Sequence, residues 1–201
     1  MKNQTTIFVA VCLICCVFYR CTTDATKADI PTADSTSTKP MYGGYASQAE
    51  WGGHLVLIGG CNDCHTPKKM TDKGPIDDTS LMLSGHAAQS PAPVLMPDQV
   101  AKGMAATYDL TAWHGPWGTS YAANLTPDST GLGAWSEQQF LTCIRKGLFQ
   151  GIEGSRPIMP PMPIASINSM TDDELKAIFA FLKTIRPIHN AVAEYQPPVT
   201  H

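Results

Sequence analysis

Apolar residues recur every three to four positions in three stretches of the chain, at residues 50–60, 136–146 and 171–186. This spacing places apolar side chains on one face of a helix. The third stretch opens with Thr171 and Glu174, a capping-box pattern in which the two side chains satisfy free amides at a helix start. We therefore predict three amphipathic helices joined by irregular chain.

The middle helix is bounded by Ser136, which has Gln139 three residues later, and by Gly147. Cys143 lies close to the apolar face of this helix. We interpret Cys143 as a small buried hydrophobic residue rather than a reactive thiol.

The chain has 201 residues, of which 16 are glycine and 16 proline, and this predicts long loops between few helices. The expected fold class is all-α with long irregular Gly/Pro-rich loops. His86 and His114 lie in such loops, where we expect surface or hydrogen-bonding roles. His54 should lie at the surface of the first helix.

The N-terminal region has the pattern of an export signal followed by a tether. Residues 7–18 form an unbroken apolar run, shorter than the roughly twenty residues that a membrane-spanning helix needs. After Cys21 the composition becomes polar, and residues 22–44 are typical of a flexible tether. Residues 1–21 thus resemble a bacterial lipoprotein leader, with Cys21 as the expected lipid-bearing residue and Cys16 as the second candidate. An uncleaved N-terminal helix is the alternative.

The charge of the chain limits its partners. The formal net charge is -3, and loss of Lys2 and Arg20 with the leader would bring it to about -5. Such a chain has no basic patch to neutralise phosphates, so nucleic acid is not an expected partner.

Residues 61–65 read Cys-Asn-Asp-Cys-His, the C-x-x-C-H pattern of covalent haem attachment. Two thiols at this spacing lie near one face of a helical turn and can form thioethers with vinyl groups on one side of a porphyrin. The adjacent imidazole can then bind the iron. We therefore predict one covalent haem c at Cys61 and Cys64, with His65 as an axial iron ligand.

Two other interpretations use the same cysteines. A thioredoxin-like redox pair would follow a strand in a βαβ unit, whereas helical spacing precedes this motif. A zinc site would need a second Cys/His pair downstream, and Cys143 has no nearby partner in the sequence.

Residues 156–164 carry Met159 and Met162 among four prolines. Proline fixes φ and removes an amide donor, so this stretch should be a stiff extended loop. A methionine thioether opposite a histidine raises the potential of a haem iron. Either methionine could supply the second axial ligand.

Four segments, at residues 60–67, 124–135, 159–163 and 171–186, share their motifs with one family. Together they resemble the monohaem class I cytochrome c domains found in cytochrome subunits of bacterial periplasmic dehydrogenases. The resemblance covers about residues 50–190. Subunits of that family commonly hold three haems, whereas this chain has a single C-x-x-C-H motif.

The resemblance implies a cytochrome c fold for residues 45–190, followed by a C-terminal arm at residues 191–201. It selects Met162, which precedes the final proline of the loop, as the axial ligand, with Met159 as second choice. Residues 81–121 are longer than a minimal cytochrome needs, and we expect them to cover the haem or to form a docking surface.

The resemblance also implies that the region of Asn124 and Trp135 approaches the haem edge or propionates. For Trp135, a place in the hydrophobic core is the alternative.

These expectations describe an exported electron-transfer protein, not an enzyme, on the periplasmic side of a bacterial membrane. Its expected partners are redox proteins, either a dehydrogenase or a terminal oxidase or other respiratory complex. The alternative is a haem enzyme or gas sensor with an open sixth site, in which His86 or His114 would act. The sequence does not separate a tethered shuttle from a subunit of a complex.

Overall fold

The computed structural model describes residues 41–94, 98 and 102–198. The expected leader with its cysteines, and the tether as far as residue 40, lie outside these residues, as do residues 199–201 of the expected C-terminal arm. Within the described ranges, no helix combines the length and the apolar character needed to cross a membrane.

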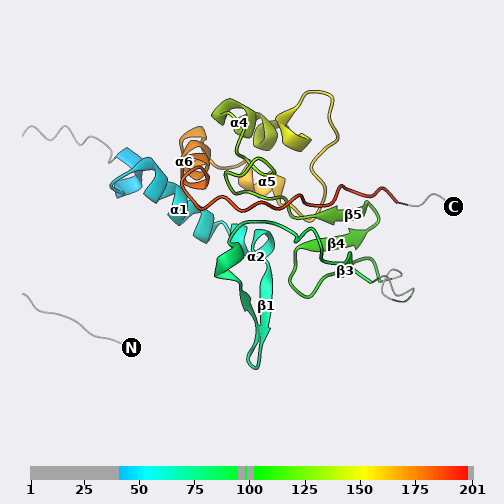
Figure 1. The fold of residues 1–201 in the computed structure, drawn as a ribbon. Helices are drawn as coiled ribbons and strands as arrows, with labels where there is room; N and C mark the ends of the chain where they lie inside the picture. The colour runs from blue at the N-terminus through cyan, green and yellow to red at the C-terminus, as the bar shows by residue number, and fades with distance from the viewer. Residues whose placement is uncertain (1–40, 95–97, 99–101, 199–201) are drawn as a thin grey trace, which may run out of the picture. The chain divides into compact units, whose positions relative to one another are not determined.

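The three predicted helices are confirmed, and within the described residues two further short helices accompany them (Figure 1). The third predicted helix ends at Leu182, earlier than the expected end at Arg186. The helices are α1 (Gln48–Ile58), α2 (Cys61–His65), α4 (Glu137–Lys146), α5 (Ile164–Ile167) and α6 (Asp172–Leu182), with 3-10 turns η1 (Met41–Gly44), η2 (Thr79–Leu81) and η3 (Phe149–Gly151).

The caps that the sequence predicted are present. The Ser136 hydroxyl accepts a hydrogen bond from the Gln139 amide at 3.1 Å, and Gly147 ends α4 in the left-handed conformation with φ 61°. Thr171 and Glu174 form both bonds of the capping box at the start of α6. These local bonds explain why the two helices begin at these residues.

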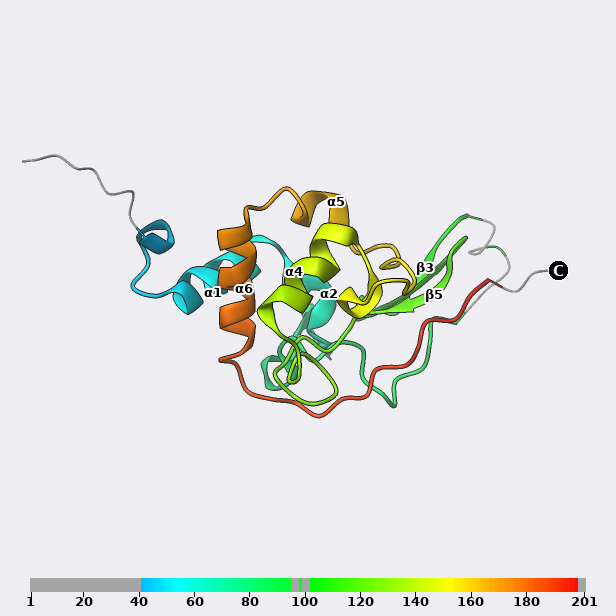
Figure 2. The same ribbon diagram turned by 90° about the horizontal axis from the view of Figure 1, so that it is seen from above.

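Helices α1 and α6 pack against each other through their backbones (Figure 2). A Cβ atom built on Gly52 would lie 1.8 Å from the carbonyl oxygen of Ala177. Only glycine at this position lets the two helices come so close.

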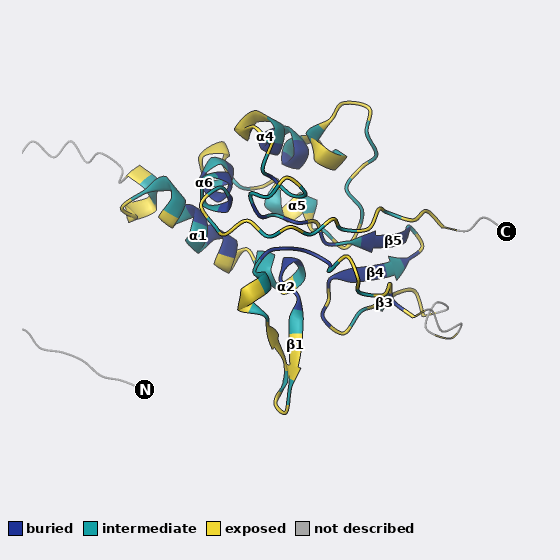
Figure 3. Ribbon diagram, in the orientation of Figure 1, coloured by how far each residue is buried: buried dark blue, intermediate teal, exposed yellow. Residues whose placement is uncertain are grey.

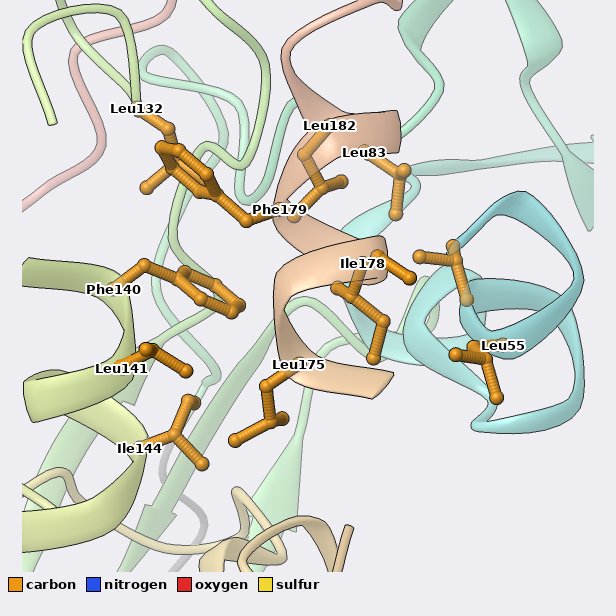
Figure 4. Close-up of a cluster of buried hydrophobic side chains, with 12 residues drawn as sticks. Leu55, Leu83, Leu132, Phe140, Leu141, Ile144, Leu175, Ile178, Phe179 and Leu182 are labelled. Atoms are coloured by element: carbon orange, nitrogen blue, oxygen red, sulfur yellow. The ribbon is translucent and has the colours of Figure 1, made fainter. Parts of the chain in front are cut away.

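A hydrophobic core lies where α1, α4 and α6 meet. In Figure 4, Phe140, Leu141 and Ile144 of α4 face α6, while Leu55 of α1 approaches α6 from the other side. The buried core consists of Leu55, Val56, Leu83, Leu132, Phe140, Leu141, Ile144, Leu175, Ala177, Ile178, Phe179 and Leu182.

Two small antiparallel sheets, which the sequence pattern did not predict, accompany the helices. The first is a hairpin that directly follows α2 and exposes most of its residues (Figure 3). The second lies within the long segment 81–121, in the order β3-β4-β5. The strands are β1 (Lys68–Thr71), β2 (Gly74–Asp77), β3 (Ala105–Ala106), β4 (Ala112–Gly115) and β5 (Gly118–Tyr121).

The described part of the C-terminal arm, residues 191–198, runs past the second sheet (Figure 1). Thr119 of β5 and Gln196 pair as an antiparallel bridge, with N–H···O distances of 2.8 and 3.0 Å. The arm therefore extends this sheet beyond β5.

Candidate functional site

The five residues of α2 carry the C-x-x-C-H motif. Gly60 precedes the helix with φ 66°, a left-handed conformation that glycine adopts without strain. Cys61 and Cys64 are half-buried and their thiols are free. The side chain of Cys61 packs against the hydrophobic core. Both thiols and the imidazole of His65 thus come from little more than one helical turn.

His65 is buried, and one of its ring nitrogens has a fixed partner. Nδ1 lies 2.8 Å from the carbonyl oxygen of Ala123, which can only accept, so Nδ1 carries the proton. Nε2, which makes no hydrogen bond with the described residues, is then the atom with a free lone pair. Burial lowers the pKa of His65 and favours the neutral ring. This tautomer and orientation are those of a histidine that binds a metal through Nε2.

The environment of the two thiols differs from that of a redox pair. Burial raises the pKa of Cys61 to about 11 and also raises the pKa of Cys64. Reactive dithiols have lowered pKa values, and the element before this motif is helix α1 rather than a strand. The structure therefore gives no support to the thioredoxin-like interpretation.

Cys143 is 8% exposed, and burial raises the pKa of its thiol to about 11. The interpretation of Cys143 as a small buried hydrophobic residue is confirmed.

In the described part of the chain, no three His, Cys, Asp or Glu side chains gather into a site for a metal ion.

Lys68, at the start of β1, secures the C-terminal end of α2. Its ammonium group donates to the carbonyl oxygens of Asn62, Asp63 and Thr66 at 2.9, 3.0 and 2.6 Å. It also forms an ion pair with Asp77 at 2.9 Å. A cation at this end adds a charged donor to carbonyl groups of the last helical turn, of which that of Asn62 also accepts from the Thr66 amide at 3.1 Å. The sequence carried no signal for this role of Lys68.

Residues 158–163, which we call the methionine strap, contain no helix or strand. The loop predicted for residues 156–164 is thus shorter at both ends, because Pro157 pairs with Leu148 in an isolated β-bridge and Ile164 begins α5. Met159 and Met162 are both half-buried. The amide of Ile158 donates to the carbonyl oxygen of Gly147 at 2.8 Å, which ties the start of the strap to the end of α4.

The other candidate histidines have partners within the protein. His86 is 1% exposed, with Nδ1 2.8 Å from the Thr111 hydroxyl and Nε2 3.2 Å from the Ser90 carbonyl oxygen. Nδ1 of His114 lies 2.9 Å from the Thr119 hydroxyl. Both histidines therefore have the hydrogen-bonding roles expected of them.

His54 of α1 is partly exposed, and its ring stacks on Tyr45 with centroids 5.2 Å apart.

Asn124 is buried, and its side chain binds the neighbouring loops. Its amide nitrogen donates to the Thr130 hydroxyl at 3.1 Å and to the Ile188 carbonyl oxygen at 2.9 Å, and its oxygen accepts from Thr126. Trp135 is half-buried against the core. An approach of either residue to a haem stays a prediction.

The donor set of α2 fits a haem c. Two free thiols at the attachment spacing and a neutral imidazole with Nε2 available are the groups that such a cofactor requires. His65, Cys61 and Cys64 are brought together by α2 itself, and the methionine strap supplies the candidate second ligand.

No protein-family model matches the chain. Comparison with curated proteins finds relatives among bacterial dehydrogenase subunits. The chain is 24% identical over 149 residues to the fructose dehydrogenase cytochrome subunit of Gluconobacter japonicus. The aligned residues are 73% of this chain and 23% of the relative. It is 33% identical over 78 residues to the gluconate 2-dehydrogenase cytochrome c subunit of Pantoea cypripedii, covering 38% of the chain and 17% of the relative.

A third relative is a nicotinate dehydrogenase subunit of Pseudomonas putida, 34% identical over 74 residues, or 36% of this chain and 6% of the relative. The chain thus spans less than a quarter of the length of each of these relatives. The predicted resemblance to cytochrome c subunits of bacterial dehydrogenases is confirmed. That the first two relatives are named cytochrome subunits agrees with the expectation that this chain is not an enzyme.

Proposed function

We propose that this chain is an electron-transfer cytochrome of the c type, in which residues 45–190 form a cytochrome c domain. One haem c would be attached through Cys61 and Cys64, with His65 and Met162 as its axial ligands. The observation that carries the proposal is the geometry of α2, where both free thiols adjoin an imidazole that the Ala123 carbonyl holds in the metal-binding tautomer.

The haem supplies reversible one-electron oxidation and reduction of its iron. The residues of this chain set the conditions for that chemistry. Ala123 keeps the proton on Nδ1 of His65, and Lys68 keeps the carbonyl end of α2 in place. If His65 and Met162 both bind the iron, small molecules would have no open coordination site. Since both ring nitrogens of His86 are hydrogen-bonded, this histidine is not available as the acid-base group of a haem enzyme.

The partners that fit this function are redox proteins, with a dehydrogenase favoured by the names of the relatives.

We further propose that the chain is exported to the periplasmic side of a bacterial membrane and anchored through a lipid on Cys21. Cys21→Ser should release the protein from membranes. Release by Cys16→Ser instead would move the anchor to Cys16, and retention of both variants would indicate an N-terminal helix.

Haem attachment is tested on the denatured protein. The full chain, produced in a cell that matures c-type cytochromes, should keep haem stain on a denaturing gel and gain the mass of one haem. Cys61→Ala and Cys64→Ala should each prevent normal maturation. Loss of all haem from the wild-type chain into acidic organic solvent would overturn the proposal.

A further inference from the structure

The methionine strap has few backbone hydrogen bonds because Pro160, Pro161 and Pro163 have no amide hydrogen. The Ile158 amide anchors its start at Gly147. Across residues 159–161, one hydrogen bond among the described residues ties the strap to another element. In it the hydroxyl of Ser120 on β5 donates to the carbonyl oxygen of Pro160 at 2.6 Å.

The hydroxyl of Ser120 is held in this direction by a second hydrogen bond. It accepts from the indole nitrogen of Trp117 at 3.2 Å, so its own hydrogen is left for Pro160. Ser120 itself is 7% exposed. The indole packs over Gly115, where a Cβ atom would lie 2.5 Å from the ring. Trp117, Ser120 and Pro160 therefore form a directed chain of partly buried hydrogen bonds, in which Ser120 is the buried member.

The hairpin that presents Ser120 is fixed from its other side by the C-terminal arm. Thr119 pairs with Gln196, and the Tyr195 hydroxyl donates to the carbonyl oxygen of Trp117. The guanidinium of Arg156, just before the strap, lies over the Phe149 ring and near the Tyr195 ring, at 3.9 and 5.0 Å from their centroids. The C-terminal arm is thus hydrogen-bonded to β5, and β5 is hydrogen-bonded to the methionine strap through Ser120.

We propose that Ser120, oriented by Trp117, is a positioning residue that holds the methionine strap in the conformation in which Met162 binds iron. This inference rests on the proposed function, because it concerns the ligand of that haem. It also gives part of the long segment 81–121 a role besides those of a cover or a docking surface. A bond between iron and a thioether is weak, so the fraction of time that the strap spends in the binding conformation sets how readily the ligand leaves.

The test compares Ser120→Ala with wild type in the full-length holoprotein. The first measurement is the weak methionine-to-iron absorption band of the ferric protein, followed as the pH is raised until the ligand is displaced. Removal of this partly buried hydrogen bond should favour displacement by roughly three- to tenfold, which moves the midpoint to lower pH. Ser120→Thr keeps the hydroxyl and should restore the wild-type midpoint. Trp117→Phe removes the donor to Ser120 and part of the ring that packs over Gly115, and it keeps the Ser120 hydroxyl, so it should give a smaller shift.

Ser155→Ala is the matched control. It removes a hydroxyl that donates to the Phe149 carbonyl oxygen at 2.7 Å, outside the strap, and should leave the midpoint unchanged. The second measurement is hydrogen exchange at the Ile158 amide, which donates to the Gly147 carbonyl oxygen at the start of the strap. It does not depend on the ligand assignment, and exchange should be faster in Ser120→Ala than in either wild type or Ser155→Ala.

If wild type lacks the methionine band while Ser120→Ala still speeds exchange, the ligand assignment fails but Ser120 still holds the strap. If Ser120→Ala matches Ser155→Ala in both measurements, Ser120 does not hold the strap. Should Ser120→Ala fail to fold, Trp117→Phe takes its place. A lower midpoint and faster exchange in Trp117→Phe than in Ser155→Ala would support the role of Ser120, and a match to Ser155→Ala in both measurements would overturn it.

Discussion

A side chain as small as a methyl group at Gly52 would collide with the backbone of Ala177, since the added carbon would lie 1.8 Å from the Ala177 oxygen. The contact joins the helix just before the haem motif to the last helix of the chain. Any change that separates these helices also opens the core between them.

Gly52→Ala should lower the free energy of unfolding by about 2–3 kcal/mol, because the helices must move apart to admit the methyl group. Gly53→Ala is the matched control, since its added carbon would approach only the ring of Phe181, at 3.1 Å. Its effect should stay within about 1 kcal/mol, helped by the better helix propensity of alanine. Urea denaturation measures both. Equal effects would mean that the close helix contact is not needed for stability.

Lys68→Met should destabilise the protein by about 2 kcal/mol, because it leaves the carbonyl groups of Asn62, Asp63 and Thr66 without their charged donor. Lys69→Met, the next residue of β1 and an exposed one, removes the same charge without these bonds. The comparison is made by thermal unfolding of the two variants. An equal loss in both variants would show that the three carbonyl bonds add nothing.

Met162→Ala should lower the midpoint potential, abolish the methionine-to-iron band and leave ferric iron open to added imidazole. Met159→Ala is the control, because Met159 is also half-buried and belongs to the same strap. Its spectrum and potential should match wild type. The opposite pattern would assign the ligand to Met159, and no change in either variant would exclude both methionines.

Asp128 should make the stability of the protein pH-dependent at acidic pH. Its carboxylate accepts from the Thr130 hydroxyl at 2.6 Å and from the Thr130 amide at 2.8 Å, and these bonds hold its pKa below the ordinary value of 3.8. A lowered pKa in the folded state stabilises the protein above about pH 4, and this contribution is lost as the pH falls through the folded pKa.

Asp128→Asn should therefore flatten the dependence of unfolding free energy on pH below about pH 4, as measured by urea denaturation across that range. Asp72→Asn removes a charge that makes no hydrogen bond with the described residues and serves as the control. If the unfolding free energy of Asp128→Asn still changed with pH as steeply as that of wild type, Asp128 would not be the source of the pH dependence.

The helices could be predicted because their signals are local. The capping box joins Thr171 and Glu174, three residues apart, and Gly147 ends α4 by its own backbone conformation. The haem motif is equally local, since α2 places Cys61 and His65 by helix geometry alone.

The hydrogen-bond partners of these groups could not be predicted, because they lie far away in the sequence. Ala123 serves His65 through a carbonyl that every residue has, and Ser120 meets Pro160 across 40 positions of sequence. The strand β4 consists of only four residues, too short for an alternating pattern to stand out. The second sheet and the contact between Ser120 and the strap follow from tertiary packing, which leaves no mark in a single sequence.

The packing of Cys61 against the core bears on when the proposed thioethers could form. Once α1 and α6 have packed together, the half-buried Cys61 side chain lies against that core and is less accessible to an attachment enzyme. Under the proposed function, the thioethers would then form more readily on a chain in which α1 and α6 are still apart. A variant that folds faster without cofactor should therefore yield a larger fraction of stable protein that carries no haem.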